Sequence, residues 1–353
     1  MKRFLAEIRS VACYLPSQSL GNQELVESFP HWTAEKIVRK LGIETRPIAA
    51  EGETATDMAV SAAEILLENG SCEHEEIDFV LLCTQSPDYF MPTSACLIHE
   101  RLGLSKTCGA LDFNLGCSGY IYGLAFAKGL IETGVAKKVL FITSETYSKY
   151  INESDRATRP LFGDAAAATL VSRVEVSDSA NPQSEEPIGP FVLGTDGSGA
   201  DLLIVPAGGH RLPCSAETAI EQPDGKGSVR SLNQLRMHGP GIFSFAADRV
   251  PPMVDDLLQK SGKTREDIGC FIFHQANKYM LNRLQELCNL KETNFFNDVM
   301  HRGNTVSSSI PIAMIDAWKC GMLRPNEVVM LVGFGVGLSW GATLVRLPAN
   351  FIA

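Results

Sequence analysis

Apolar positions along the chain form two kinds of segment. Short continuous apolar runs occur at FVLLC (79–83), VLFIT (139–143), CFIF (270–273) and VVMLVG (328–333), and such runs are typical of strands buried on both faces of a sheet. Longer stretches such as GYIYGLAFAKGLI (119–131) carry little polar surface and predict buried helices. The pattern therefore predicts a layered α/β protein.

Two parts of this pattern recur at an offset close to 190 residues. Residues 62–85 and 252–275 both read as a helix closed by glycine, an acidic stretch and an Ile-led strand. Residues 130–145 and 317–335 both read as a helix that ends at a glycine before a Val-rich strand. Two matches in one register favour duplication over chance. We expect two α/β halves, residues 1–176 and 177–353, joined through the polar segment EVSDSANPQSEEP.

Composition narrows the function class. The chain has 353 residues, 45% of them hydrophobic, and a net charge of -10, which argues against general nucleic-acid binding. Glu7 and Arg9 interrupt the first apolar segment, so we expect a first strand there rather than a signal peptide. No stretch reaches the roughly 18 apolar residues of a membrane helix. The ten cysteines show no CxxC pairs, so we expect free thiols, no metal site and a cytoplasmic location.

Cys117 lies in LDFNLGCSGYIYGL, where a short apolar run turns into a helical pattern. A thiol at a helix N-terminus lies near the positive end of the helix dipole, so we expect a lowered pKa and a nucleophilic thiolate. Gly116 and Gly119 would allow a tight turn and close approach of a substrate. The alternative is a buried structural cysteine, which is the commoner role of cysteine in apolar sequence.

Two polar residues of the second half are candidate partners of the thiol. Under an offset of about 187–190 residues, Asn304 corresponds approximately to Cys117, and His274 corresponds to Cys83. We therefore expect Cys117, His274 and Asn304 at related strand ends, facing one another across a pseudo-twofold axis. The alternatives are a hydrogen-bonded core histidine, and a turn or helix N-cap asparagine.

The last apolar segment, LVGFGVGLSWGATLVRL (331–347), contains closely spaced glycines. This spacing is a weak sign of a dinucleotide-binding loop, and neither the helix nor the acidic residue that such a loop needs follows it. A glycine turn between two terminal strands is the better interpretation. Its backbone N–H groups would be able to face an oxyanion.

In their order, the motifs GCSGY, HQAN, GNTVSSSIP and GFGVGLSWG resemble the β-ketoacyl-acyl-carrier-protein synthase III family of the thiolase superfamily. The segments LGIETRPIA, ACLIHERLG and MHGPGIF extend the resemblance over almost the whole chain. It implies a thiolase-like five-layered αβαβα fold built from two duplicated halves. It also implies a homodimer.

The resemblance implies a mechanism and substrates. A primer thioester would acylate Cys117, and His274 and Asn304 would hold the thioester oxygen of a malonyl-type extender as it loses CO2. The backbone N–H groups of Cys117 and Val336 would form a second oxyanion hole. Coenzyme A or phosphopantetheine thioesters would be substrates, with no further cofactor, and an acyl carrier protein would be a partner. No nucleic acid or membrane would take part.

Substrate contacts follow from the same resemblance, with several departures. The implied contacts are Lys40, Met91, Arg156, Leu161, Phe243 and Asn277. The chain has Lys36 where the family often has a tryptophan that stacks on adenine, Tyr279 in place of a carrier-contacting arginine, Pro240 in place of an asparagine, and Val336 in place of a glycine. Met91 replaces a frequent Phe, and its flexible side chain predicts tolerance of longer primers.

Two other functions remain compatible with these residues. One is an acyltransferase that passes the acyl group from Cys117 to another nucleophile without decarboxylation. The other is a non-catalytic partner subunit of a larger synthase, against which the complete set of Cys117, His274 and Asn304 argues.

Overall fold

Two five-stranded sheets with the same strand arrangement form the centre of the computed structural model, which describes residues 3–29, 32–176 and 186–353. The first sheet has the order β1 (Arg3–Tyr14), β7 (Ala165–Val176), β6 (Lys138–Glu145), β4 (Phe79–Cys83), β5 (Gly109–Phe113). The second has the order β8 (Ile188–Thr195), β16 (Ser339–Arg346), β15 (Val328–Gly335), β13 (Cys270–Phe273), β14 (Phe295–Phe296). In both, the first two pairings are antiparallel and the last two are parallel. The repeat predicted from the sequence is thus present in the topology.

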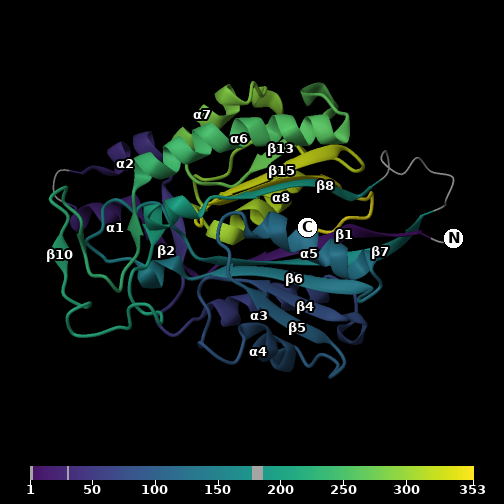
Figure 1. Cartoon of the computed structure of the whole chain (residues 1–353), viewed down its shortest axis with the longest axis horizontal. Helices are drawn as coiled ribbons and strands as arrows, with labels where there is room; N and C mark the ends of the chain where they lie inside the picture. The colour runs from purple at the N-terminus through teal and green to yellow at the C-terminus, as the bar shows by residue number, and fades with distance from the viewer. Residues whose placement is uncertain (1–2, 30–31, 177–185) are drawn as a thin grey trace.

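Six longer helices complete five layers (Figure 1). The inner layer holds α5 (Gly119–Glu132) and α8 (Ser309–Lys319), the first sheet is covered by α3 (Ala55–Glu68) and α4 (Ser94–Arg101), and the second by α6 (Gly239–Ser261) and α7 (Lys278–Leu287). Three apolar clusters fill the spaces between these layers. The predicted αβαβα fold is confirmed.

The inner helices fit because small residues bring them close to the strands. A Cβ atom on Gly123 of α5 would lie 2.0 Å from the ring of Phe141 in β6. Phe141 stacks in turn on Tyr120 of the same helix, with ring centroids 5.4 Å apart. Every large side chain in this contact is fully buried, which explains why the 119–131 segment is apolar on all sides.

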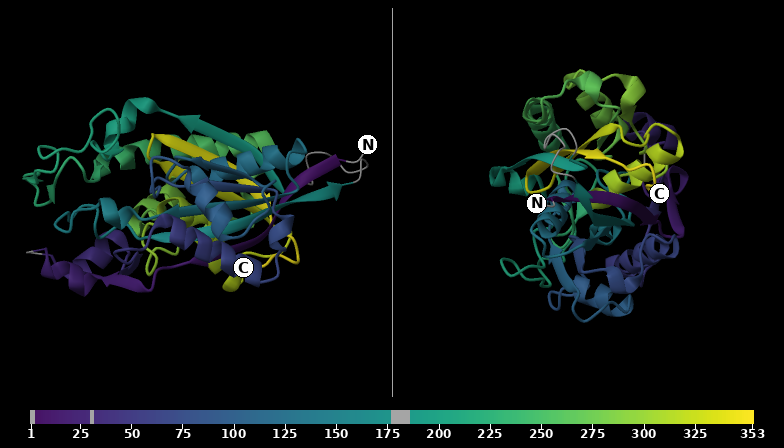
Figure 2. Two further views of the ribbon diagram at one scale, coloured as in Figure 1. Left: turned by 90° about the horizontal axis from the view of Figure 1, so that it is seen from below. Right: turned by 90° about the vertical axis from the view of Figure 1, so that its right-hand side faces the viewer.

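Shorter elements gather at one end of the molecule (Figures 1 and 2). They are α1 (Asn22–Glu27), α2 (Ala34–Leu41) and the strand pairs β2 (Gln18–Gly21) with β3 (Thr45–Ile48), β9 (Leu203–Ile204) with β12 (Arg236–Met237), and β10 (Gln222–Pro223) with β11 (Val229–Arg230). Single 3-10 turns span His74–Glu76, Tyr147–Tyr150, Gly197–Leu202, Arg265–Asp267, Glu292–Asn294 and Val306–Ser308.

The buried Arg46 of β3 connects this end to the central sheets. Its guanidinium donates hydrogen bonds to the Leu20 carbonyl, the Asn22 side chain and the Pro160 carbonyl, at 2.8 to 2.9 Å. Burial lowers the pKa of Arg46 to about 10, so the side chain remains charged at neutral pH. The RPI motif therefore fixes the β2–β3 pair against the segment that follows residue 160.

The sequence-based expectations for the elements are confirmed where the structure describes them. The four short apolar runs lie in β4, β6, β13 and β15, the first segment forms β1, and the terminal glycines form the turn between β15 and β16. The boundary between residues 176 and 177 stays a prediction, since 177–185 lie outside the described residues. Among the described segments, no helix has the length and apolar character needed to cross a membrane.

Candidate active site

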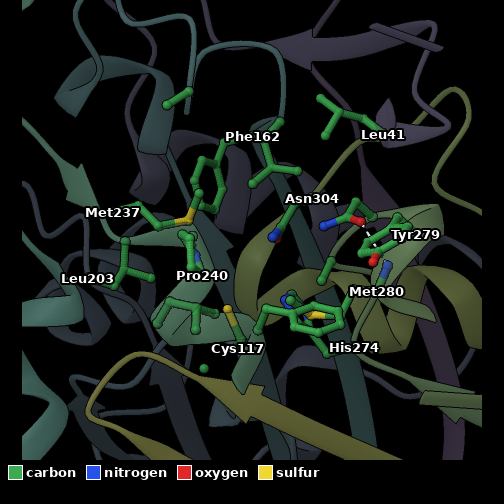
Figure 3. A pocket seen from close by; sticks show the side chains of 18 of the residues that line it. Leu41, Cys117, Phe162, Leu203, Met237, Pro240, His274, Tyr279, Met280 and Asn304 are labelled. Atoms are coloured by element: carbon green, nitrogen blue, oxygen red, sulfur yellow. Dashed lines mark hydrogen bonds between the residues drawn. The ribbon is translucent and has the colours of Figure 1, made fainter. Parts of the chain in front are cut away.

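Three side chains predicted from the sequence line one cavity of about 690 Å3. Cys117 precedes Ser118, the N-cap of α5; His274 directly follows β13; and Asn304 lies in the turn before α8. Their exposed fractions are 4%, 2% and 4%. Figure 3 shows the three side chains converging on the same space. The structure therefore brings together residues from both halves of the chain.

The prediction that the Cys117 pKa is lowered is wrong. Burial, followed by the negative charge of Glu145, raises the pKa of the thiol to about 12, although the N–H groups of Cys117 and Val336 act in the opposite direction. Removal of the charged sulfur from water outweighs the helix dipole here. The resting residue is a neutral thiol.

Gly116 and Gly119 serve protein packing, which corrects the expectation that they admit a substrate. A Cβ atom on Gly116 would lie 2.6 Å from both Gln85 Oε1 and Val336 Cγ1, and one on Gly119 would lie 2.3 Å from Cys83 Sγ. Gly335, at the end of β15, has the role that was assigned to them. Its Cβ atom would lie 2.9 Å from Cys117 Sγ, so a side chain at 335 would press on the thiol.

His274 is a neutral imidazole in a buried site. Burial lowers the pKa of His274 to about 3, more than a backbone hydrogen bond with Val306 raises it. Its Nδ1 lies 2.7 Å from Ser309 Oγ, and Ser309 Oγ also accepts a hydrogen bond from the N–H of Gln275 at 3.3 Å. These contacts fix the ring and leave a neutral donor and acceptor beside Cys117.

Asn304 is held through its backbone and its side chain. Its N–H donates to the Leu161 carbonyl at 2.9 Å, and its carbonyl accepts from the Gly163 N–H at 3.0 Å. The side-chain Oδ1 accepts from the N–H of Val306 at 2.9 Å. Because Oδ1 is engaged within the turn, the amide Nδ2 is the group that faces the cavity (Figure 3). Asn304 is thus both a turn residue, the simpler alternative, and a wall of the candidate site.

The implied backbone oxyanion hole lies at the sulfur. The N–H groups of Cys117 and Val336 both form hydrogen bonds that favour the Cys117 thiolate. A side chain at position 336 leaves this N–H in place, so the replacement of glycine by Val336 keeps the donor. Binding of a substrate oxyanion by the pair stays a prediction.

The implied substrate contacts fall into three groups. Lys40, Leu161, Phe243 and Asn277 line the catalytic cavity. Arg156 lines an adjoining pocket of about 800 Å3, which shares several lining residues with the cavity, and the two form one channel. Met91 lies between β4 and α4, has 83% of its surface exposed and does not line this cavity.

Sequence reasoning missed an aromatic residue at the outer end of the channel. Trp32 lies in the same pocket as Arg156, and the ammonium groups of Lys36 and Lys40 lie 5.3 and 5.2 Å from its ring centroid. The register along the motif assigned this place to Lys36, whereas Trp32 reaches it from just before α2. Its position ahead of the N-cap Thr33 was the available signal.

Two departures from the family pattern form part of the channel wall. The ring of Tyr279, on α7, stacks on that of Phe243, on α6, with centroids 5.5 Å apart and planes at 29°. Pro240, in the first turn of α6, lines both the cavity and the outer pocket. An aromatic pair and a proline therefore replace polar groups along this side of the entrance.

Comparisons with known proteins agree with this geometry. The family model for 3-oxoacyl-[acyl-carrier-protein] synthase III matches residues 111–197, and the model for its C-terminal part matches residues 258–347. A β-ketoacyl-[acyl-carrier-protein] synthase III from Caldanaerobacter subterraneus subsp. tengcongensis is 34% identical over 98% of both chains. One from Sulfurovum sp. is 36% identical over 99% of this chain and 98% of the relative.

Solved structures show the same similarity in three dimensions. A crystal structure of a 3-oxoacyl-(acyl-carrier-protein) synthase III is 48% identical, covers 97% of this chain and 100% of its own, and has a TM-score of 0.93. The corresponding synthase III from Pseudomonas aeruginosa PAO1 is 29% identical over 98% of both chains, with a TM-score of 0.84.

Proposed function

Because the chain belongs to the 3-oxoacyl-[acyl-carrier-protein] synthase III family, we propose that it condenses an acyl primer on Cys117 with a malonyl-type thioester. The observation that carries the proposal is the convergence of a thiol, a neutral imidazole and an amide N–H in one buried cavity. A channel joins that cavity to a pocket with cationic and aromatic walls.

The first half-reaction transfers the acyl group to the enzyme. The sulfur of Cys117 attacks the thioester carbonyl of an acyl-CoA, the bond to the coenzyme A sulfur breaks, and the thiol proton passes to the departing thiolate. The N–H groups of Cys117 and Val336 stabilise the oxyanion of the tetrahedral intermediate. The neutral His274 is positioned to carry the proton, since its low pKa leaves it unprotonated at neutral pH.

The second half-reaction forms the carbon–carbon bond. The malonyl thioester loses CO2, and His274 and Asn304 donate hydrogen bonds to its thioester oxygen as the enolate forms. The enolate carbon attacks the acyl carbonyl on Cys117, the carbon–sulfur bond breaks, and the thiolate takes up a proton from solvent. The high pKa of Cys117 makes the return to the thiol favourable.

The channel gives each thioester a path to Cys117. We assign its apolar inner part to the pantetheine arm and the outer pocket, with Trp32, Arg156 and the lysines, to the phosphates and base of coenzyme A. A second copy of the chain and an acyl carrier protein complete the proposal. Tyr89, Phe90 and Met91, which are 60%, 84% and 83% exposed, support a protein contact next to the site.

Intact-mass spectrometry tests the first step. The wild-type protein is incubated with acyl-CoA thioesters of increasing chain length, from acetyl to decanoyl. We expect the mass of one acyl group to appear with at least one of them, and to be absent from Cys117→Ala. An equal mass gain in the Cys117→Ala variant would assign the nucleophile elsewhere. No gain with any thioester would contradict the proposed function.

A further inference from the structure

The pseudo-twofold axis gives the Cys117 site a counterpart with different chemistry. β6 and β15 have eight residues each and the N-caps of α5 and α8 are Ser118 and Ser308, and both pairs of elements are 190 residues apart. On this superposition Cys117 corresponds to Ser307, which refines the approximate match with Asn304. Gly335, which touches the Cys117 sulfur, corresponds to Glu145, the last residue of β6.

Glu145 is fully buried and contacts its counterpart residue directly. The Ser307 hydroxyl donates to Oε1 at 2.9 Å, and Oε2 accepts from the Gln85 N–H at 3.0 Å and from the Ser86 hydroxyl at 3.2 Å. No arginine, lysine or histidine is among these partners. A buried carboxyl that is held only by neutral donors has no evident role in stability alone.

Ser307 belongs to the turn that holds both oxyanion donors. This turn, residues 304–309, begins with Asn304 and ends with Ser309, which contacts the His274 ring. Between them, Val306 has a φ of 54°, a left-handed conformation that is unfavourable for a β-branched residue. The surrounding contacts must impose it, and the Ser307–Glu145 hydrogen bond is the contact that ties the middle of the turn to the first half.

We propose that Glu145 is a positioning residue for decarboxylation, which through Ser307 keeps Asn304 and His274 aimed at the thioester oxygen. The inference rests on the proposed function, since it concerns the second half-reaction. The geometry separates it from the first half-reaction, because the N–H groups at the Cys117 sulfur belong to Cys117 and Val336, outside the 304–309 turn.

The charge of Glu145 supports this role. Burial raises its pKa to about 8, against the effect of its three hydrogen bonds. The titratable groups that face it are Cys83, Cys117, Tyr147, Tyr150 and Asp164, and none of these is a cation. At neutral pH the carboxyl is therefore mainly protonated and adds no negative charge beside the developing enolate.

The test compares the two half-reactions in Ser307→Ala, Glu145→Ala and Glu145→Gln. Cys117 acylation is followed by intact mass with the acyl-CoA that the wild type accepts, and decarboxylation by CO2 release from malonyl-acyl carrier protein. Since misplaced catalytic groups cost up to about 100-fold, we expect Ser307→Ala and Glu145→Ala to lose roughly 10–100-fold in decarboxylation and little in acylation. Glu145→Gln keeps the shape and should retain decarboxylation at pH 7.

A matched control and a pH series complete the experiment. Ser144→Ala, on the neighbouring residue, removes a buried hydroxyl that donates to the Ala55 carbonyl at 2.7 Å, and should leave both half-reactions intact. Above about pH 8, where Glu145 ionises, decarboxylation by Glu145→Gln should overtake that of the wild type.

Three results would overturn the inference: wild-type decarboxylation in Ser307→Ala, equal losses in both half-reactions, or an unchanged ratio of Glu145→Gln to wild type above pH 8. If Glu145→Ala does not fold, Ser307→Ala decides. A wild-type protein that acylates Cys117 but releases no CO2 from malonyl-acyl carrier protein would instead contradict the proposed function.

Discussion

At the scale of single residues, two opposing effects act on Cys117. A helix N-terminus stabilises a nearby anion by about 0.3–1 kcal/mol, and a pKa unit corresponds to about 1.4 kcal/mol, so the dipole alone lowers a pKa by less than one unit. Burial and Glu145 instead raise the pKa of the thiol from 9.0 to about 12. Sequence shows the helix start, but not the depth of burial, and the smaller effect was the visible one.

Alkylation kinetics test the protonation state of Cys117. Because the thiolate is the reactive form and the pKa is about 12, the rate of Cys117 modification by iodoacetamide should keep rising from pH 7 to about pH 10. Peptide mass spectrometry separates Cys117 from the other nine cysteines. A rate that levels off below pH 9 would mean that the thiol is far more acidic than its buried environment indicates.

The catalytic candidates could be predicted because each follows an element with a clear pattern. Cys117 and His274 lie directly at the ends of apolar segments, and their motifs carry the family resemblance. Glu145 also ends a predicted strand, but its importance depends on Ser307, which is 162 residues away in sequence. No local pattern reveals a hydrogen bond of that kind.

At the scale of elements, continuous apolar runs identified the central strands, because strands covered on both faces need apolar side chains throughout. The strands at the channel end could not be predicted in the same way. β9 to β12 have two residues each, which is too short for any periodicity. Their position depends on loop contacts, so the wall of the outer pocket and the place of Trp32 became known only from the structure.

Two glycines of α5 provide a matched test of the inner layer. Gly123→Ala would place a Cβ atom 2.0 Å from the Phe141 ring, and such overpacking costs about 1–3 kcal/mol. Gly129 has no atom within 4 Å of the same position, so Gly129→Ala should stabilise the helix by about 0.5–1 kcal/mol. Urea unfolding measures both. Equal effects of the two substitutions would contradict the close contact between α5 and β6.

At the scale of the whole molecule, the two halves share one topology and contribute different groups to one site. The first half provides Cys117 and Glu145, and the second provides His274, Asn304 and the turn that Glu145 holds. The duplicated fold thus places a nucleophile on one side of the pseudo-twofold axis and a carboxyl–serine pair on the other. A reaction with two half-reactions uses this asymmetry.

The exposed apolar residues of the 89–91 segment predict a dimer. Phe90→Asp would place a charge in a buried contact between two copies, so light scattering should show monomers where the wild type is dimeric. Val135→Asp is the control, since Val135 is also exposed, at 66%, but does not belong to this aromatic segment. A Phe90→Asp protein that remains dimeric would show that the 89–91 segment is not the contact.

The most direct test of the account is product analysis after one turnover. Protein carrying an acyl group on Cys117 is separated from free thioester and mixed with malonyl-acyl carrier protein. We predict that the acyl mass leaves the protein while one CO2 is released and a 3-oxoacyl group, longer by two carbons than the primer, appears on the carrier. Transfer of the unchanged acyl group to the carrier or to another acceptor, without CO2, would contradict the account.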